Sequence, residues 1–123
     1  MIKLIMCVTK KDDMTRKEFQ EYWLNTHGEL LKKFAKTYNV KKYTQSHTID
    51  SSLNENVRKS RQMPELEYDG IAELWWESEK EFIEAISSEE GVKLRTVFLD
   101  DEAKFLNFSK STAFFTKEFE IVK

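Results

Sequence analysis

Residues 15–28, TRKEFQEYWLNTHG, contain the signals that define the first helix of the chain and place a histidine, His27, on its apolar face. The first four residues, Thr-Arg-Lys-Glu, have the spacing of a capping box, which predicts that a helix begins near residue 15. Phe19, Trp23 and His27 then recur at i, i+4 and i+8 and share one face of that helix. The imidazole is therefore expected to lie at least partly buried beside two aromatic rings.

Two roles for His27 remain open at this point. In a structural role, the ring packs on Trp23 and one nitrogen bonds a backbone carbonyl freed where Gly28 breaks the helix. In a chemical role, His27 is a general acid or base, because the unperturbed pKa of imidazole is the closest to neutral. Asp101 falls on the same predicted helical stripe as Phe105. If its carboxylate reached His27, it would fix the tautomer of the ring and raise its pKa.

Length and composition limit the class of protein. The 123 residues predict one domain, residues 1–123, with a modest core. Charges of both signs are interspersed and sum to −2, which argues against a nucleic-acid partner. The single cysteine, Cys7, excludes an internal disulfide, and the apolar run 1–8 is too short for a signal peptide or a membrane span. We therefore expect a cytoplasmic protein with no membrane partner.

The hydrophobic pattern predicts an α+β fold. Strands are expected at 2–8, 40–49, 71–76 and 114–121. One helix is expected from residue 15 to about 38, with Asn39 as its terminator, and a second from Ser78 to about 105, interrupted at 87–91. This order is that of the ferredoxin-like βαββαβ fold, in which two helices cover one face of a four-stranded antiparallel sheet. Because apolar residues occupy both faces of three strands, a second copy of the chain is expected to cover the other face.

Residues 51–68 show no sustained period and contain the only proline. We therefore predict a long loop that acts as a mobile or interface-ordered flap. Its polar residues are expected to contact either the partner chain or the mouth of a cavity, and they are Asn54, Asn56, Arg58 and Arg61.

Aromatic residues make up 13% of the chain, a large share for so polar a sequence, and predict a pocket or a dimer interface. Tyr43 and His47 share one face of the second strand, whereas Trp75 and Trp76 must point to opposite faces of the third. No histidine and carboxylate cluster suggests a metal site, and no phosphate-binding motif suggests a nucleotide, so no cofactor is expected. The residues predicted to bind a small apolar or aromatic ligand are Trp23, Tyr43, His47, Arg58, Arg61, Trp75 and Phe105.

Three separated motifs, Tyr22-Trp23-x3-His27-Gly28, the run from Asp69 to Trp75, and Asp101-Glu102-x2-Phe105, resemble the EthD family of the dimeric α/β barrel superfamily. The resemblance covers nearly the whole chain. It implies a homodimer whose two sheets face each other to close a barrel. It also implies that His27 corresponds to the recurrent histidine of the family, and that Asp101 and Glu102 correspond to its acidic pair.

The resemblance implies activity only in outline, because the superfamily includes cofactor-free monooxygenases, polyketide cyclases and other enzymes. Phe119 stands where the family often has a second histidine. The expected activity is that of a cofactor-free enzyme, monooxygenase-like or cyclase-like, in which His27 and Asp101 act on a small carbonyl or phenolic compound. The alternatives are a non-catalytic small-molecule-binding protein and a structural homodimer.

Overall fold

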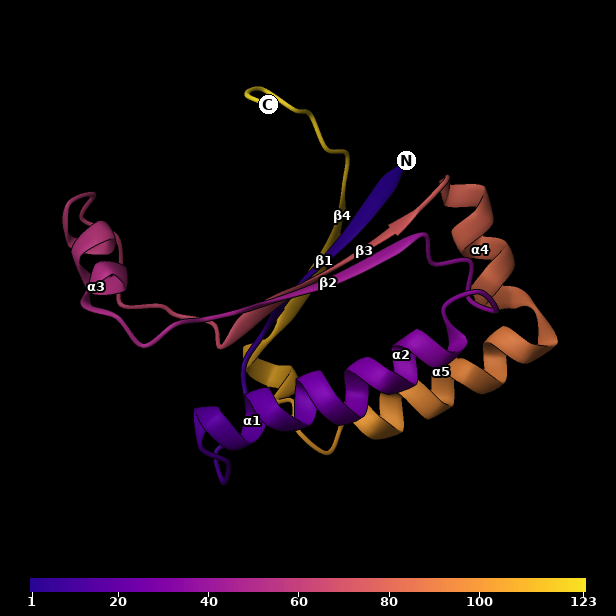
Figure 1. Cartoon of the computed structure of the whole chain (residues 1–123), viewed down its shortest axis with the longest axis horizontal. Coiled ribbons are helices and arrows are strands. Elements are labelled where there is room, and N and C mark those ends of the chain that lie inside the picture. Colours follow the sequence, from indigo (N-terminus) through magenta and orange to yellow (C-terminus); the bar gives the residue numbers. More distant parts are fainter.

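The computed structural model describes residues 1–123 and is built on one antiparallel sheet of order β2-β3-β1-β4 (Figure 1). The strands are β1 (Ile2–Val8), β2 (Lys42–His47), β3 (Gly70–Trp76) and β4 (Thr112–Thr116). The helices are α1 (Arg16–Tyr22), α2 (Gly28–Phe34), α3 (Ser52–Lys59), α4 (Glu79–Ser87) and α5 (Glu89–Glu102). This order and pairing confirm the predicted α+β, ferredoxin-like fold.

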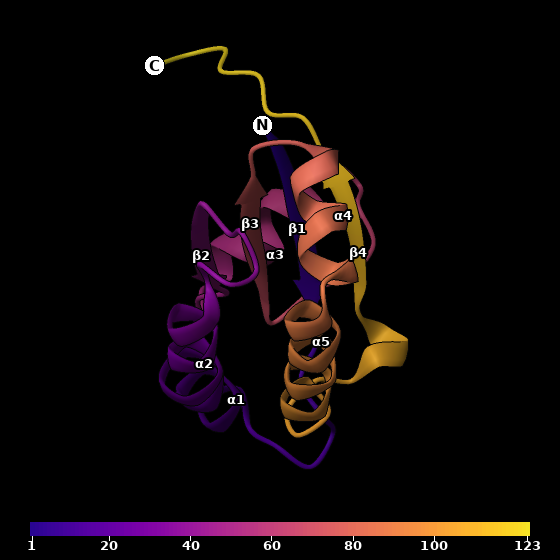
Figure 2. The ribbon, with the colours of Figure 1, turned by 90° about the vertical axis from the view of Figure 1, so that its right-hand side faces the viewer.

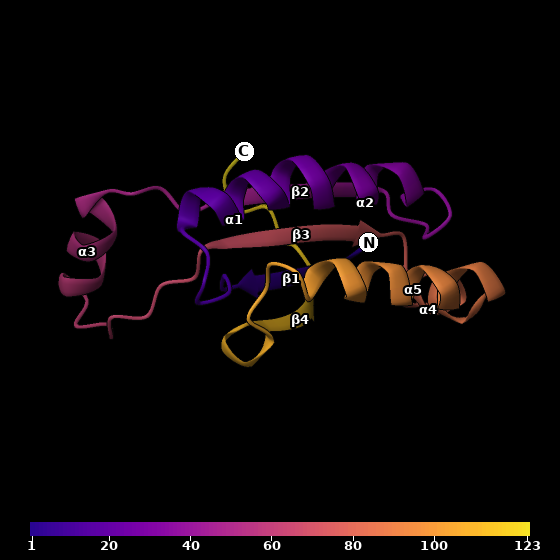
Figure 3. The same ribbon diagram turned by 90° about the horizontal axis from the view of Figure 1, so that it is seen from below.

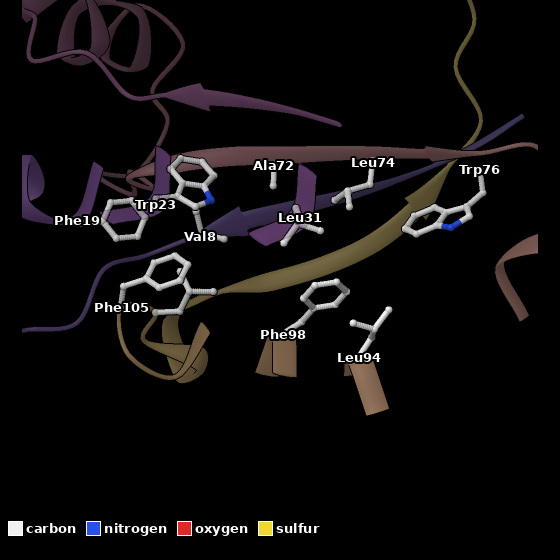
Figure 4. Packing of buried hydrophobic residues seen from close by; sticks show 11 residues of the cluster. Val8, Phe19, Trp23, Leu31, Ala72, Leu74, Trp76, Leu94, Phe98 and Phe105 are labelled. Atoms are coloured by element: carbon white, nitrogen blue, oxygen red, sulfur yellow. The ribbon is translucent and has the colours of Figure 1, made fainter. Parts of the chain in front are cut away.

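The register assigns every strand residue to one of two faces of the sheet. Leu4 of β1 pairs with Leu74 of β3, which pairs in turn with Tyr43 of β2, so these side chains share the face that the helices cover. Figures 2 and 3 show the α1–α2 and α4–α5 segments side by side along this face. Figure 4 shows Leu74 directed toward Phe98 of α5. The hydrophobic core therefore lies between one face of the sheet and two helical segments.

The opposite face of the sheet, which we call the open face, is not covered within the chain. Its apolar side chains are Ile5, Cys7, Ile71, Trp75 and Phe114. They are accompanied by an ion pair between Lys3 and Glu73, whose Nζ and Oε2 atoms lie 2.7 Å apart. Ile71 and Phe114 are 37% and 48% exposed. Trp75 and Trp76 point to opposite faces as expected, with Trp76 buried under the helices.

The first helix does not break at Gly28, contrary to the sequence-based prediction. Gly28 has ordinary helical angles, φ −58° and ψ −42°. The irregularity precedes it: residues Trp23–His27 form a π-helical turn between α1 and α2. Such a turn inserts one extra residue per turn and rotates the side chains that follow. Beyond Phe34 the chain continues in turns to Asn39, whose φ of 58° ends the segment as predicted.

The prediction of a structureless loop at 51–68 is wrong, because Ser52–Lys59 form helix α3. Ser51 caps this helix by accepting a hydrogen bond from the Leu53 amide. α3 lies on an arm, residues 48–69, that projects beyond the end of the sheet (Figure 1). Arg16 binds the base of this arm through Asp50, Glu67 and Asp69. No buried side chain supports α3 itself.

The last strand is shorter than predicted and ends at Thr116 instead of Ile121. Thr116 pairs with Lys3, so β1 has almost no residues left to pair with a longer β4. The remaining residues leave the sheet on the side away from the helices (Figure 1).

Gly70 is required where the first helix meets the sheet. A Cβ atom at this position would lie 2.5 Å from the ring of Trp23 and 2.7 Å from the carbonyl oxygen of Ser46. The absent side chain lets Trp23 pack directly on β3, where it is 2% exposed.

No helix in the structure is both long and apolar enough to cross a membrane.

Candidate active site

A buried hydrogen bond between His27 and Asp101 joins the two helical segments. His27 ends the π-helical turn and is 6% exposed, and Asp101 lies in the last turns of α5 and is 7% exposed. The distance from His27 Nδ1 to Asp101 Oδ2 is 2.7 Å. Tyr22 donates its hydroxyl proton to the other oxygen, Asp101 Oδ1, at 2.6 Å. The structure thus brings together the two residues that the sequence predicted as catalytic.

This arrangement sets the tautomer of His27. An ionised carboxylate only accepts hydrogen bonds, so Nδ1–H of His27 donates to Asp101. In the neutral ring the second nitrogen, Nε2, then carries a lone pair, and no protein group bonds to it. A buried carboxylate, an oriented imidazole and a free Nε2 are the components of a general base.

Burial lowers the pKa of His27 below its ordinary value, while the hydrogen bond and the charge of Asp101 oppose that shift. Asp101 thus acts on the pKa of His27 in the expected direction, but the net shift is downward. The reason is that desolvation of the cationic ring outweighs its attraction to the carboxylate. Burial therefore favours the neutral ring, which is able to accept a proton.

His27 lines an apolar cavity of about 120 Å³ between the sheet and the helices. Fourteen of the sixteen residues around it are hydrophobic, and the other two are His27 and Glu102. Of the residues expected to bind a ligand, Trp23, Tyr43 and Phe105 are among those that line the cavity. The centroid of the Phe105 ring lies 5.0 Å from that of His27.

Glu102 is a site residue whose place at the cavity the sequence did not indicate. Its carboxyl group makes no hydrogen bond or ion pair with the protein. Burial, together with the neighbouring charge of Asp101, raises the pKa of Glu102 to about 7. Its position could have been recognised, because Glu102 follows Phe98 by four residues and so extends the inward stripe of α5. The cavity thus contains one group with a lowered pKa and one with a raised pKa, a pattern typical of acid–base sites.

Four predicted ligand-binding residues do not line this cavity. His47 stacks on Trp23 at a centroid distance of 4.6 Å and bonds Gln45 through Nε2. Trp75 lies on the open face, under the ammonium groups of Lys3 and Lys42. Arg58 pairs with Glu65 and Glu67 on the projecting arm. Arg61 is also on the arm and contacts only nearby Val57 and Ser60 through hydrogen bonds.

Fold and site together define a ferredoxin-like protein with a carboxylate–imidazole pair at an apolar cavity. The family model described as EthD domain matches residues 11–109, so the chain belongs to the EthD family. No curated protein matches the chain in sequence.

Several solved structures share the fold. An EthD-family protein from Bacillus halodurans is 19% identical, with 97% of this chain and 99% of that chain covered and a TM-score of 0.65. A dimeric protein of unknown function with a ferredoxin-like fold, from Bacteroides fragilis, is 12% identical, with 95% of each chain covered and a TM-score of 0.60. SnoaB, a cofactor-independent oxygenase from Streptomyces nogalater, is 9% identical, with coverage of 98% and 95% and a TM-score of 0.59. At these identities the likeness is one of fold.

The opposing effects of burial and Asp101 predict how the pKa of His27 responds to mutation. We expect an NMR titration to give His27 a pKa below about 6.5, the ordinary value. Asp101→Asn should lower it further, because the substitution removes the charge that favours the cation. His47, which does not contact Asp101, serves as the internal control and should titrate unchanged. A pKa of His27 above 6.5, or a rise in the variant, would contradict this description of the site.

Proposed function

We propose that this EthD-family protein is a cofactor-free enzyme that transfers a proton on a small, largely apolar carbonyl or phenolic compound, with His27 as the general base. The observation that carries the proposal is the position of His27. Its Nδ1 is anchored to Asp101, its Nε2 has no protein partner, and its ring lines an apolar cavity. A nitrogen that has no protein partner and faces a cavity can accept a hydrogen bond or a proton from a ligand.

The chemistry follows from the protonation states of the two polar groups. Nε2 of the neutral imidazole accepts a proton from a phenolic O–H, or from a C–H next to a carbonyl. Asp101 stabilises the imidazolium that forms. In the second case the electron pair moves to the carbonyl oxygen, and Glu102, with a pKa of about 7, can donate a proton there. The product of that step is an enol.

An enol or phenolate is the reactive intermediate of both reaction classes expected from the family. Its nucleophilic carbon can attack a second carbonyl of the same molecule, as in a cyclase, or react with dioxygen, as in a monooxygenase. In the second case the substrate supplies the electrons, one oxygen atom is retained as a carbonyl and the other leaves as water. SnoaB, a cofactor-independent oxygenase that shares the fold, supports the second class. The cavity volume of about 120 Å³ limits the buried part of the compound to one ring, because an engineered cavity of about 150 Å³ holds benzene.

Proton transfer can be tested before the natural substrate is identified. The probe is phenylacetone, an enolisable ketone with a single ring, whose α-hydrogens exchange with D2O and can be followed by NMR. We expect the protein to accelerate this exchange above the rate of imidazole at the same concentration. His27→Gln should reduce the acceleration by on the order of 10²–10⁴-fold, the usual contribution of a general base.

His47→Gln is the matched control, because that histidine does not line the cavity, and its exchange rate should stay within a few-fold of the wild type. Equal rates for the wild type and His27→Gln would contradict catalysis by His27. Binding of the ketone without exchange would favour the alternative of a non-catalytic small-molecule-binding protein.

We also propose that two copies of the chain associate through their open faces. Ile71 and Phe114 are large apolar side chains that remain exposed on this face of the isolated chain. The Bacteroides fragilis structure, which shares the fold, is described as dimeric. An interface of roughly 2,000 Å² in total is expected for a stable association of this kind.

Light scattering tests the dimer directly. The wild type should have the mass of two chains. The double variant that carries Ile71→Lys and Phe114→Lys should have the mass of one chain, because burial of the two new ammonium groups in the interface is costly. Ile83→Lys on α4 is the control, since that side chain is 55% exposed but lies away from the open face. A wild type that is monomeric at micromolar concentration, or a dimer that survives the double substitution, would contradict the proposal.

A further inference from the structure

A second hollow, which we call the side groove, lies on the surface between α2 and the edge strand β2. Its volume is about 440 Å³, and it is open to solvent. Gly28 and Leu31 line it from the helix, and Tyr43 and Gln45 line it from the strand. Figure 2 shows α2 lying under β2 at this edge of the molecule. The proton-transfer chemistry above does not use this groove.

The side groove and the internal cavity share two residues, Leu31 and Tyr43. A single layer of side chains therefore separates solvent from the space beside His27. Tyr43 is held in that layer by Gln45, whose Nε2 donates to the Tyr43 hydroxyl at 2.7 Å. A ligand that passes from the groove to the cavity must displace the shared wall residues, Leu31 and Tyr43.

Gly28 keeps the side groove open next to this wall. A Cβ atom there would lie 3.4 Å from Gln45 Nε2 and 3.4 Å from the carbonyl oxygen of Trp23. A methyl group is therefore tolerated, whereas a longer side chain would extend across the groove. Gly28 has helical angles, so its role at this position is to provide space.

Positive charge surrounds the side groove. Residues 30–49 contain five lysines and no acidic residue, in a chain whose net charge is −2. All five lysines are exposed, and none takes part in an ion pair. Lys32, Lys41 and Lys42 line the groove, together with one acid, Glu29. The ammonium group of Lys42 lies over the Trp75 ring at 4.8 Å, so Lys32 and Lys41 are the cations free to meet a ligand.

We infer that the side groove is the access route to the cavity and a binding site for a carboxylate. The substrate class is then an amphiphilic anion, with a ring or short apolar chain beside His27 and a carboxylate at Lys32 and Lys41. This inference rests on the proposed function and adds the charge of the substrate and its direction of approach. Because the groove is open to water, each lysine contributes modestly and the attraction is screened by salt.

Two probes that differ only in charge test the carboxylate site. They are 3-phenylpropanoate and its neutral amide, 3-phenylpropanamide, each with one ring for the cavity and a short chain that ends in the group under test. Binding is followed by tryptophan fluorescence and by the NMR signals of His27 and Gly28. We expect the carboxylate to bind about 5-fold or more tightly than the amide at low salt, with a smaller preference at high salt.

Lys32→Gln with Lys41→Gln should abolish this preference and leave the affinity for the amide unchanged. Both side chains are exposed, so the double variant is expected to fold. Lys80→Gln with Lys93→Gln, on α4 and α5, is the matched control and should retain the preference. Equal affinities in the wild type, a preference that survives Lys32→Gln with Lys41→Gln, or no binding of either probe would overturn the carboxylate site.

Gly28→Leu tests the access route. A leucine in the groove should slow association of both probes by about 10-fold or more, and Gly28→Ala should not. Unchanged association in Gly28→Leu would overturn the route. If that variant does not fold, Tyr43→Phe replaces it, because loss of the hydrogen bond from Gln45 should speed association, and an unchanged rate would again overturn the route.

The same binding measurements in His27→Gln separate this inference from the proposed function. The carboxylate preference should persist there, because Lys32 and Lys41 do not depend on the base. If the carboxylate is preferred over the amide but hydrogen exchange does not depend on His27, the catalytic proposal alone is refuted. If hydrogen exchange depends on His27 but the carboxylate is not preferred over the amide, the carboxylate site alone is refuted.

Discussion

The hydrogen bond between His27 and Asp101 is the interaction on which the site depends. It joins the helical segment that follows β1 to the helix that precedes β4, and therefore ties the two halves of the βαββαβ chain together. The same bond orients the imidazole and leaves Nε2 free beside the cavity. Removing the carboxylate would leave a buried N–H without a partner, at a cost of about 1–3 kcal/mol. Fold stability and site geometry thus rest on the same pair of atoms.

Local sequence signals were sufficient for the fold. Thr15 and Ser78 marked helix starts as N-capping residues, and alternating patterns marked the strands, so the ferredoxin-like order followed. His27 and Asp101 were both predicted to face inward from their helical stripes, and the structure joins them. The helix in the arm was missed although Ser51 is a good cap and Leu53 and Val57 have helical spacing. None of the residues of α3 is buried, so its apolar side chains do not form a core-facing stripe.

Other features depend on contacts between distant parts of the chain and could not be predicted from the local sequence. The π-helical turn replaces the break expected at Gly28, and it brings His27 to α5. The direction of the His27 pKa shift depends on how deeply the ring is buried, which no spacing gives. β4 stops where its partner β1 begins. The side groove arises because α2 lies against the edge strand, which brings Leu31 and Tyr43 into one wall.

The central claim is that Nε2 of His27 is a free acceptor at the wall of a cavity that admits a ligand. The most direct measurement is a crystal structure with p-cresol, a single-ring phenol without an anionic tail. If the proposed role of His27 is right, the cresol ring lies in the cavity with its oxygen within hydrogen-bond distance of Nε2, ~2.6–3.2 Å. A cavity filled by the protein's own side chains, with Nε2 bonded to a protein group and no bound cresol, would contradict it and assign His27 a structural role.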